Sequence, residues 1–258
     1  MVRALLFDGE ARRVEGYSAQ LPHRAEAAAD CLDEMHRLAL AAGFRIRAVA
    51  GRAETEVTAQ DRSSWPAFEG AAWFPALPEG AGAVLGSGCL GRERFALVIG
   101  EASGLGTIVD AAVEELRCVS LDEKRWLVAG ATPEAGLIYP AIKRKTRGSV
   151  EAFLATAQEG DPMLQPVEEA VRRVREIFDA LVTAIGMPSA VVGSGGVLLK
   201  SPSLSQRIAN ALGVPLTWCT EPEPAARGAA LWALEKLGAI ENLEALPAST
   251  GAVFEPAA

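Results

Sequence analysis

The sequence is poor in the residues that build metal centres and disulfide frameworks. Its 258 residues include only two histidines and four cysteines, and the histidines show no metal-ligand spacing. The cysteines, at positions 31, 89, 118 and 219, form no Cys-x-x-Cys pair. This scatter argues against a zinc site or a disulfide framework, and it favours a reduced, cytoplasmic protein.

Long apolar runs and basic stripes are also absent. No apolar run reaches the roughly 18 residues that a membrane helix needs, and the first residues do not read as a signal peptide. The formal net charge is -8 and the pI is near 5.0. Without basic stripes interleaved with aromatics, nucleic-acid binding is not expected. The one basic cluster, residues 143–147, is interpreted as a solvated helix end.

Half of the residues are apolar, which is enough for a sizeable core in one large domain or two small ones. Periodicity and turn residues predict a mixed α/β chain. The elements expected before residue 80 are a strand over 2–7, a hairpin turn at 8–10, a strand over 13–21, a helix over 25–42, a strand over 45–50, and an aromatic-rich connector that packs against the core.

The second part of the chain is expected to alternate hairpins and helices. The amphipathic stripe from Val167 to Ile185 is the strongest helix signal in the sequence. The other expected elements are strands over 94–100 and 105–109, a hairpin over 118–129, a helix over 132–145, a strand over 216–219, a helix over 225–237, and a polar tail on the surface after residue 238.

One stretch connects these elements to chemistry. Val191 to Lys200 reads as two β-branched residues, the sequence Gly-Ser-Gly-Gly, and then the approach to a helix over 204–212. Glycines let a backbone approach a ligand closely, and N–H groups at a helix start attract anions. The pattern is compatible with a nucleotide cradle, but taken alone it favours an ordinary tight β–α turn, because short glycine motifs are common.

The order of motifs resembles FGGY-type carbohydrate kinases, and gluconokinase-like members most. The resemblance is carried by Gly-Ser-Gly-Gly with the Ile-Ala-Asn-Ala-Leu-Gly-Val-Pro-Leu that follows it, by Glu-Pro-Ala-Ala-Arg-Gly-Ala-Ala-Leu-Trp, by the stretch from Trp73 to Cys89, and by the hairpin that begins at Phe95. It covers most of the chain and is most specific in the C-terminal part.

The resemblance implies an actin-like ATPase (ribonuclease-H-like) α/β fold with a truncated first domain. By position, residues 1–50 are a remnant of the FGGY N-terminal domain, 51–78 a connector, 79–240 the C-terminal actin-like domain, and 241–258 a tail. It also implies transfer of the γ-phosphoryl group of MgATP to a sugar or sugar acid such as gluconate. The implied general base is Glu79, and the implied nucleotide contacts are Ser103, Gly104, Gly193, Ser194, Gly195, Gly196 and Lys200.

Five departures from the family pattern bear on activity. The opening phosphate hairpin and most of the first, sugar-binding domain are missing, and a loop-rich section before residue 167 is reduced. Glu79 stands where the family has aspartate, which displaces the base by about one methylene, and catalysis is sensitive to shifts of about 1 Å. Glu101 stands in the hairpin tip, where its carboxylate repels a γ-phosphate.

Three functions therefore remain open: an active, divergent sugar kinase whose cleft a partner chain completes, a non-catalytic relative that binds nucleotide or protein partners, and a shortened product without activity. A truncated first domain leaves apolar surface exposed, which predicts self-association into a homo-oligomer.

Overall fold

The computed structural model describes residues 2–22, 27–51, 62–78, 80–100, 103–145, 149–158 and 160–257. The chain forms two compact units. Unit 1 comprises Met1–Leu77 and Ala225–Pro247, and unit 2 comprises Pro78–Pro224 and Ala248–Ala258. Residues 225–247, which the sequence analysis divided between the 79–240 domain and the tail, thus group with the N-terminal part of the chain.

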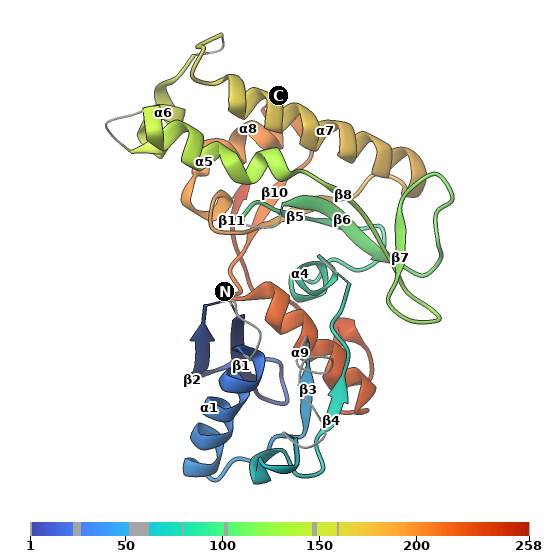
Figure 1. Ribbon diagram of the computed structural model, residues 1–258. Helices are drawn as coiled ribbons and strands as arrows, with labels where there is room; N and C mark the ends of the chain where they lie inside the picture. Colours follow the sequence, from blue (N-terminus) through green and yellow to red (C-terminus); the bar gives the residue numbers. More distant parts are fainter. Residues whose placement is uncertain are drawn as a thin grey trace. The chain divides into compact units, whose positions relative to one another are not determined.

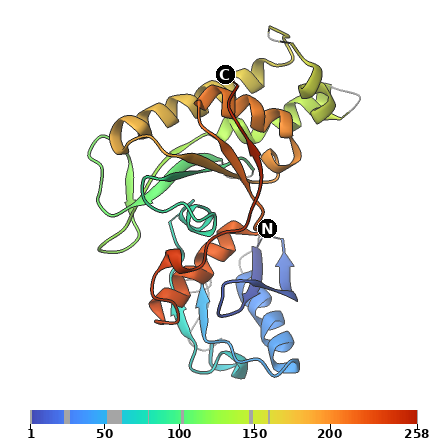
Figure 2. The same ribbon diagram turned by 180° about the vertical axis from the view of Figure 1, so that it is seen from behind.

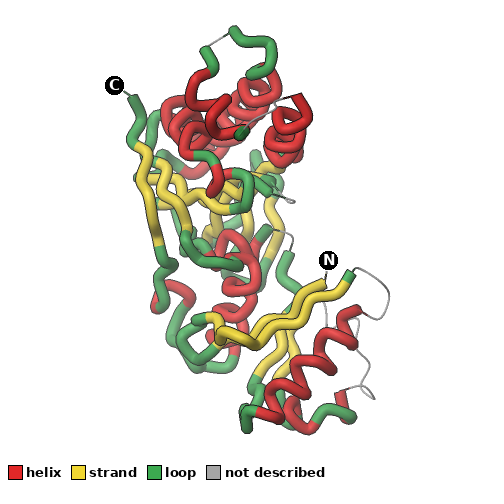
Figure 3. The backbone as a smooth tube through the Cα atoms, turned by 90° about the vertical axis from the view of Figure 1, so that its left-hand side faces the viewer, coloured by secondary structure: helices red, strands yellow, loops and turns green. Residues whose placement is uncertain are grey.

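Unit 1 contains a β-hairpin covered by one helix. Strands β1 (Val2–Phe7) and β2 (Arg13–Leu21) pair antiparallel, and α1 (Ala27–Ala41) packs on both. Figure 3 shows the helix lying along the hairpin. The helix is held by an apolar face whose buried members include Cys31, Met35 and Ala39. The helix was expected to begin at residue 25, and residues 25 and 26 lie outside the described ranges.

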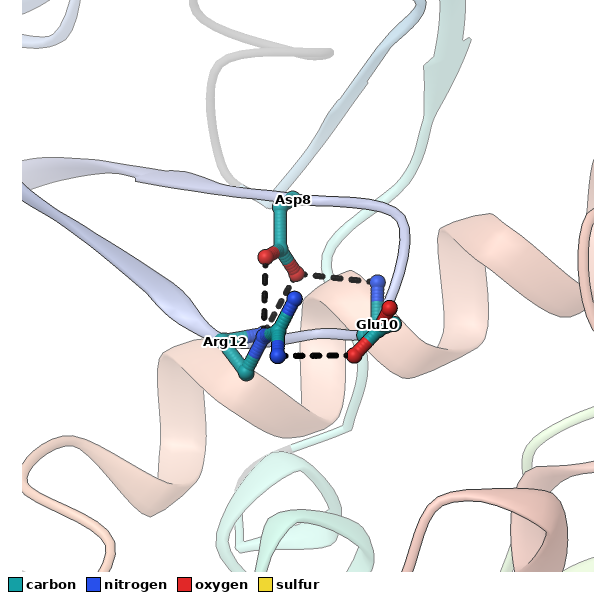
Figure 4. Close-up of polar contacts among 3 residues, drawn as sticks. All are labelled: Asp8, Glu10 and Arg12. Carbon is teal, nitrogen blue, oxygen red and sulfur yellow. Dashed lines mark hydrogen bonds and ion pairs between the residues drawn. The ribbon is translucent and has the colours of Figure 1, made fainter.

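The hairpin turn expected at residues 8–10 is present, and one carboxylate organises it (Figure 4). Asp8 accepts the backbone N–H groups of Glu10 and Arg12, each at 2.9 Å, and the Nε–H of Arg12 at 3.0 Å. Arg12 also forms an ion pair with Glu10 at 2.9 Å. Asp8 therefore stabilises a tight turn by accepting hydrogen bonds from backbone N–H groups, as aspartate commonly does.

The rest of unit 1 is small. Strands β3 (Ala48–Ala50) and β4 (Ala72–Phe74) pair in parallel, and the 3₁₀ turn η1 (Pro66–Phe68) lies against α1. The expected packing role of the aromatic connector is confirmed by Trp65 and Phe68, which are buried in the core of this unit. The unit also contains α9 (Pro224–Lys236) and η3 (Leu243–Ala245).

Arg227 on α9 is buried, and its guanidinium donates to the carbonyl oxygens of Leu246 at 2.9 Å and Pro247 at 3.1 Å. Arg227 therefore has a structural role within unit 1.

Unit 2 is built on a seven-stranded mixed sheet in the order β11-β10-β9-β5-β6-β8-β7. In chain order its strands are β5 (Arg94–Val98), β6 (Gly104–Val109), β7 (Cys118–Ser120), β8 (Trp126–Ala131), β9 (Ala190–Ser194), β10 (Leu216–Cys219) and β11 (Thr250–Phe254). The two expected hairpins are confirmed as β5–β6 and β7–β8, both antiparallel.

Helices cover both faces of this sheet (Figure 1). The larger cover consists of α5 (Pro133–Lys145), α7 (Gln165–Ile185) and α8 (Pro202–Leu212), with α6 (Val150–Thr156) beside α8. The short α4 (Ala81–Gly86) lies on the opposite face, against β5 and β6. The apolar stripe predicted for α7 lies on the face that this helix buries, which includes Val174, Phe178 and Leu181.

The tail differs from the sequence prediction. Instead of a purely polar surface segment, residues 250–254 form β11, which pairs antiparallel with β10 at the edge of the sheet (Figure 2). Phe254 packs on Trp218 with ring centroids 5.1 Å apart. Among the described residues, no helix has the length and apolar character required to cross a bilayer.

Candidate functional site

The carboxyl ends of four strands of unit 2 meet at one edge of the sheet. Strand β9 pairs in parallel with β5 and β10, with Ser194 opposite Val98 and Gly193 opposite Trp218. Strand β8 runs in the same direction, because β6 pairs antiparallel with both β5 and β8. In open α/β sheets, ligands bind outside the carboxyl ends of parallel strands. This edge is therefore the candidate site.

The glycine turn after β9 and the tip of the β5–β6 hairpin are bonded to each other at this edge. The backbone N–H of Ile99 donates to the carbonyl of Ser194 at 2.9 Å, and the N–H of Val197 donates to the carbonyl of Ile99 at 3.2 Å. The predicted strand, turn and helix are present as β9, the 3₁₀ turn η2 (Leu198–Lys200) and α8. The structure thus brings Gly193–Gly196 beside the hairpin predicted to contact phosphate.

Two of the three glycines in the turn are required for packing. A Cβ at Gly195 would lie 2.3 Å from the carbonyl oxygen of Ile99, and its φ of 98° is one that other residues rarely adopt. A Cβ at Gly193 would lie 2.5 Å from the buried side chain of Leu198. Either substitution would push against the surrounding core.

Gly196 has no such structural requirement. It is exposed, and a Cβ there would meet nothing within 4 Å. Open space beside a glycine backbone is what a closely approaching ligand needs. Within the predicted nucleotide cradle, Gly196 is the position that remains free for contact.

The two residues that flank the hairpin tip, Gly100 and Ser103, are bonded to each other. The hydroxyl of Ser103 accepts the N–H of Gly100 at 3.2 Å and donates to the carbonyl of Gly100 at 3.1 Å. Its carbonyl accepts the N–H of Thr132 at 2.9 Å. The tip also lies close to α5, because a Cβ at Gly136 would lie 2.4 Å from the oxygen of Gly100. The absence of a side chain at Gly136 therefore permits this contact.

The N-terminus of α8 is already occupied. From the sequence, N–H groups at the helix start are expected to attract a ligand anion, but the carboxylate of Glu151 on α6 takes that place. It accepts the backbone N–H of Ser203 at 3.0 Å and the hydroxyl of Ser203 at 2.6 Å, and it also accepts the hydroxyl of Ser201. Lys200, just before this start, is exposed.

Two residues that the sequence analysis singled out lie outside the described residues: Glu79, the predicted base, and Glu101, in the hairpin tip. Gly80, which follows Glu79, precedes α4 with a φ of 84°. Among the residues the structure describes, no group of three or more His, Cys, Asp or Glu side chains could hold a metal ion.

The role of Glu151 in binding the start of α8 was not predicted from the sequence. An acidic residue in the first turn of a helix is common, because it complements the helix dipole. Nothing local in the sequence indicates that its partners are Ser201 and Ser203, some 50 positions away. The serines carry a weak signal, since Ser201 before Pro202 is a typical helix cap.

No protein-family model and no curated protein matches this sequence. Solved structures do match. The xylulose kinase of Lactobacillus acidophilus matches with a TM-score of 0.68 at 16% identity, and the gluconate kinase of the same organism with 0.66 at 17%. Each match covers 78% of this chain and 50% of the other, so this chain spans about half the length of those kinases.

A smaller protein matches along its whole length. The ROK hexokinase of Thermus thermophilus has a TM-score of 0.57 at 18% identity, covering 91% of this chain and 95% of that one. At such identities the likeness shows the fold alone. The chain therefore has the actin-like ATPase fold expected from the sequence.

Proposed function

We propose that the chain binds ATP at the carboxyl edge of the unit 2 sheet and is a relative of the sugar kinases. The observation that carries this proposal is the turn after β9, where Ser194 and Val197 are bonded to Ile99 of the hairpin, Gly195 packs closely against Ile99, and Gly196 presents open backbone. The matching structures are sugar kinases, and they include the glycerol kinase of Plasmodium falciparum with ADP.

The proposed reaction is transfer of the γ-phosphoryl group of MgATP to a hydroxyl of a sugar or sugar acid such as gluconate. Glu79 accepts the proton of that hydroxyl while the hydroxyl oxygen bonds to the γ-phosphorus. The bond between the γ-phosphorus and the ADP leaving group breaks in the same step. Gly193–Gly196 hold the nucleotide, while Ser103, Gly104 and Lys200 contact the phosphates. Mg²⁺ enters with ATP, where it neutralises developing charge.

Calorimetric titration with MgATP tests the site, and Gly196 is the position to change. Gly196→Asp adds bulk and negative charge where nothing else lies within 4 Å, so the variant should keep its melting temperature. It should bind MgATP at least about tenfold more weakly, because its carboxylate would repel the phosphates. Gly196→Ala, which adds bulk only, should weaken binding less.

The matched control is Gly9→Asp. Gly9 is also exposed, and a Cβ there would meet nothing within 4 Å, but it lies in the β1–β2 turn of unit 1. This variant adds the same charge and should bind MgATP as the wild type does. Gly195 is unsuitable as a probe, because a side chain there would collide with Ile99 and lower affinity by unfolding the turn. If Gly196→Asp binds as wild type, the nucleotide site lies elsewhere.

A nucleotide-binding protein without turnover is the second candidate. It is favoured by the Ser103 hydroxyl, which is engaged with Gly100 rather than available to a phosphate, and by the presence of a glutamate, Glu101, in the sequence of the same hairpin. Release of ADP measured with gluconate, xylulose and glycerol separates the two candidates. Turnover that Glu79→Gln abolishes supports the kinase, whereas binding without turnover on any acceptor supports the second candidate.

A further inference from the structure

Three donor groups at the start of α8 converge on one carboxylate. Oε1 of Glu151 accepts the N–H and the hydroxyl of Ser203, at 3.0 and 2.6 Å, and Oε2 accepts the hydroxyl of Ser201. Ser201 is buried, and its hydroxyl oxygen also accepts the N–H of Leu204 at 3.3 Å. Hydrogen bonds to an ionised carboxylate are stronger than neutral ones, so this contact fixes the start of α8 firmly.

Ser201 is also the last residue of the segment 197–201, which directly follows the open backbone at Gly196. At one end of this segment, Val197 is bonded to Ile99 of the hairpin. At the other end, the N–H of Ser201 donates to the carbonyl of Leu198 at 3.0 Å. Gly196 lies just before the segment and Lys200 within it, so the position of both depends on where Ser201 is held.

We propose that Glu151 is a positioning residue for the nucleotide turn: from α6, through Ser201 and Ser203, it holds the segment that presents Gly196 and Lys200. This inference rests on the proposed function and assigns to it a residue that does not itself contact the nucleotide. It also means that the phosphates do not bind at the N-terminus of α8, because the chain's own carboxylate fills that place.

The same pair of helices offers a matched control. The guanidinium of Arg207 on α8 donates to the carbonyl oxygens of Leu154 at 3.3 Å and Ala157 at 2.8 Å, at the C-terminal end of α6. It therefore ties α6 to α8 as Glu151 does, but through groups that lie away from Ser201. Arg207→Met removes these bonds and keeps most of the apolar stem.

The experiment compares Glu151→Ala, Glu151→Gln and Arg207→Met by two measurements. Amide hydrogen exchange should rise at residues 199–203 in Glu151→Ala and stay unchanged there in Arg207→Met. Calorimetry should show MgATP binding weakened about tenfold in Glu151→Ala and by less than about twofold in Arg207→Met. Glu151→Gln keeps an acceptor without the charge, so it should fall between wild type and Glu151→Ala, and it serves as the test if the alanine variant does not fold.

The outcomes separate the two proposals. Equal losses of affinity in the Glu151 and Arg207 variants would reduce Glu151 to a general helix contact and overturn the inference, while nucleotide binding by the wild type would still stand. If the wild type binds no nucleotide, the proposed function fails, and the exchange at 199–203 still decides whether Glu151 holds the turn. Unchanged exchange there in both Glu151 variants also overturns the inference.

Discussion

At the scale of single residues, burial makes the thiol of Cys89 a much weaker acid than usual. It follows α4, is fully buried, and donates its S–H to the carbonyl of Ser87 at 3.7 Å. Burial raises the pKa of its thiol far above the usual range, the thiol of Cys219 raises it further, and Arg94 opposes the change only in part. Because the unfolded chain ionises this thiol more readily, stability should be lost as pH rises.

The window for that loss begins at the ordinary cysteine pKa of about 8.5. Above it, the free energy of unfolding of wild type should fall relative to Cys89→Ala by up to about 1.4 kcal/mol per pH unit. Urea unfolding at several pH values between 7 and 10 measures this difference. Parallel curves for the two proteins would show that Cys89 does not contribute to the alkaline loss.

Asp8 has the opposite pH dependence. Burial alone would raise its pKa, but the N–H groups of Arg12 and Glu10 and the Arg12 side chain outweigh burial, so the pKa of Asp8 is lowered. Its stabilisation is therefore present above the unfolded pKa of about 3.9 and lost as pH falls through the folded value.

Asp8→Asn should reduce the free energy of unfolding at pH 7 by less than about 1 kcal/mol, because the ion pair is exposed and screened. The difference from wild type should shrink as pH falls below the unfolded pKa of about 3.9, because a protonated Asp8 carries no more charge than asparagine. Denaturant unfolding at pH 7 and at pH 2 checks this. A difference that persists at pH 2 would assign the effect to turn geometry rather than to charge.

The sequence predicted that Gly193–Gly196 form one turn, but it could not distinguish Gly195 from Gly196. The distinction depends on the φ of Gly195 and on the carbonyl of Ile99, which lies about 95 positions away in the chain. Whether Glu79 acts as a base also stays a prediction, because the residue type alone does not show what the carboxylate contacts. Residue type is local information, whereas a close approach is set by the packing of distant strands.

At the scale of elements, α7 was predictable and β11 was not. The α7 stripe repeats at helical spacing over 21 residues, so its buried face can be read directly from the sequence. Strand β11 has five residues, contains a glycine and is almost wholly exposed. It carries no alternating pattern, and its pairing comes from the free edge of β10.

Phe254→Ala tests whether β11 stabilises unit 2. The ring is half-buried and packs on Trp218, which also donates from its indole to Ser205 on α8 at 2.9 Å. Loss of the ring should lower the free energy of unfolding by about 1–3 kcal/mol. Val253→Thr, on the exposed face of the same strand, is the control and should change stability by less than about 0.5 kcal/mol. Equal effects would mean that β11 contributes little through Phe254.

At the scale of the whole molecule, exposed apolar side chains predict self-association. Leu40 and Phe44, at and just beyond the end of α1, are 58% and 42% exposed, and Phe44 contacts Tyr17 with ring centroids 5.1 Å apart. Light scattering at micromolar concentration should detect dimers or larger species. The double variant Leu40→Gln and Phe44→Gln should shift the distribution towards monomer. A wild type that is purely monomeric would contradict the prediction.

The fold as a whole was predictable from the order of motifs, and the division into units was not. The motifs that follow β9 predict α8, β10 and α9 in this order along the chain. No motif predicts that α9 groups with the N-terminal residues. That grouping depends on packing between segments more than 140 positions apart in the chain.

The division has a practical consequence, because the backbone passes between the units three times, at 77/78, 224/225 and 247/248. Neither unit is one continuous stretch, so no single cut releases either of them intact. A fragment of residues 78–224 alone would lack β11. Within unit 2, however, the N–H of Thr220 donates to the carbonyl of Ser249 at 2.9 Å, and the N–H of Ser249 donates to Glu221 at 2.8 Å. The ends at 224 and 248 can therefore be joined by a few glycines, which makes unit 2 a candidate for expression as a rejoined, single-chain domain.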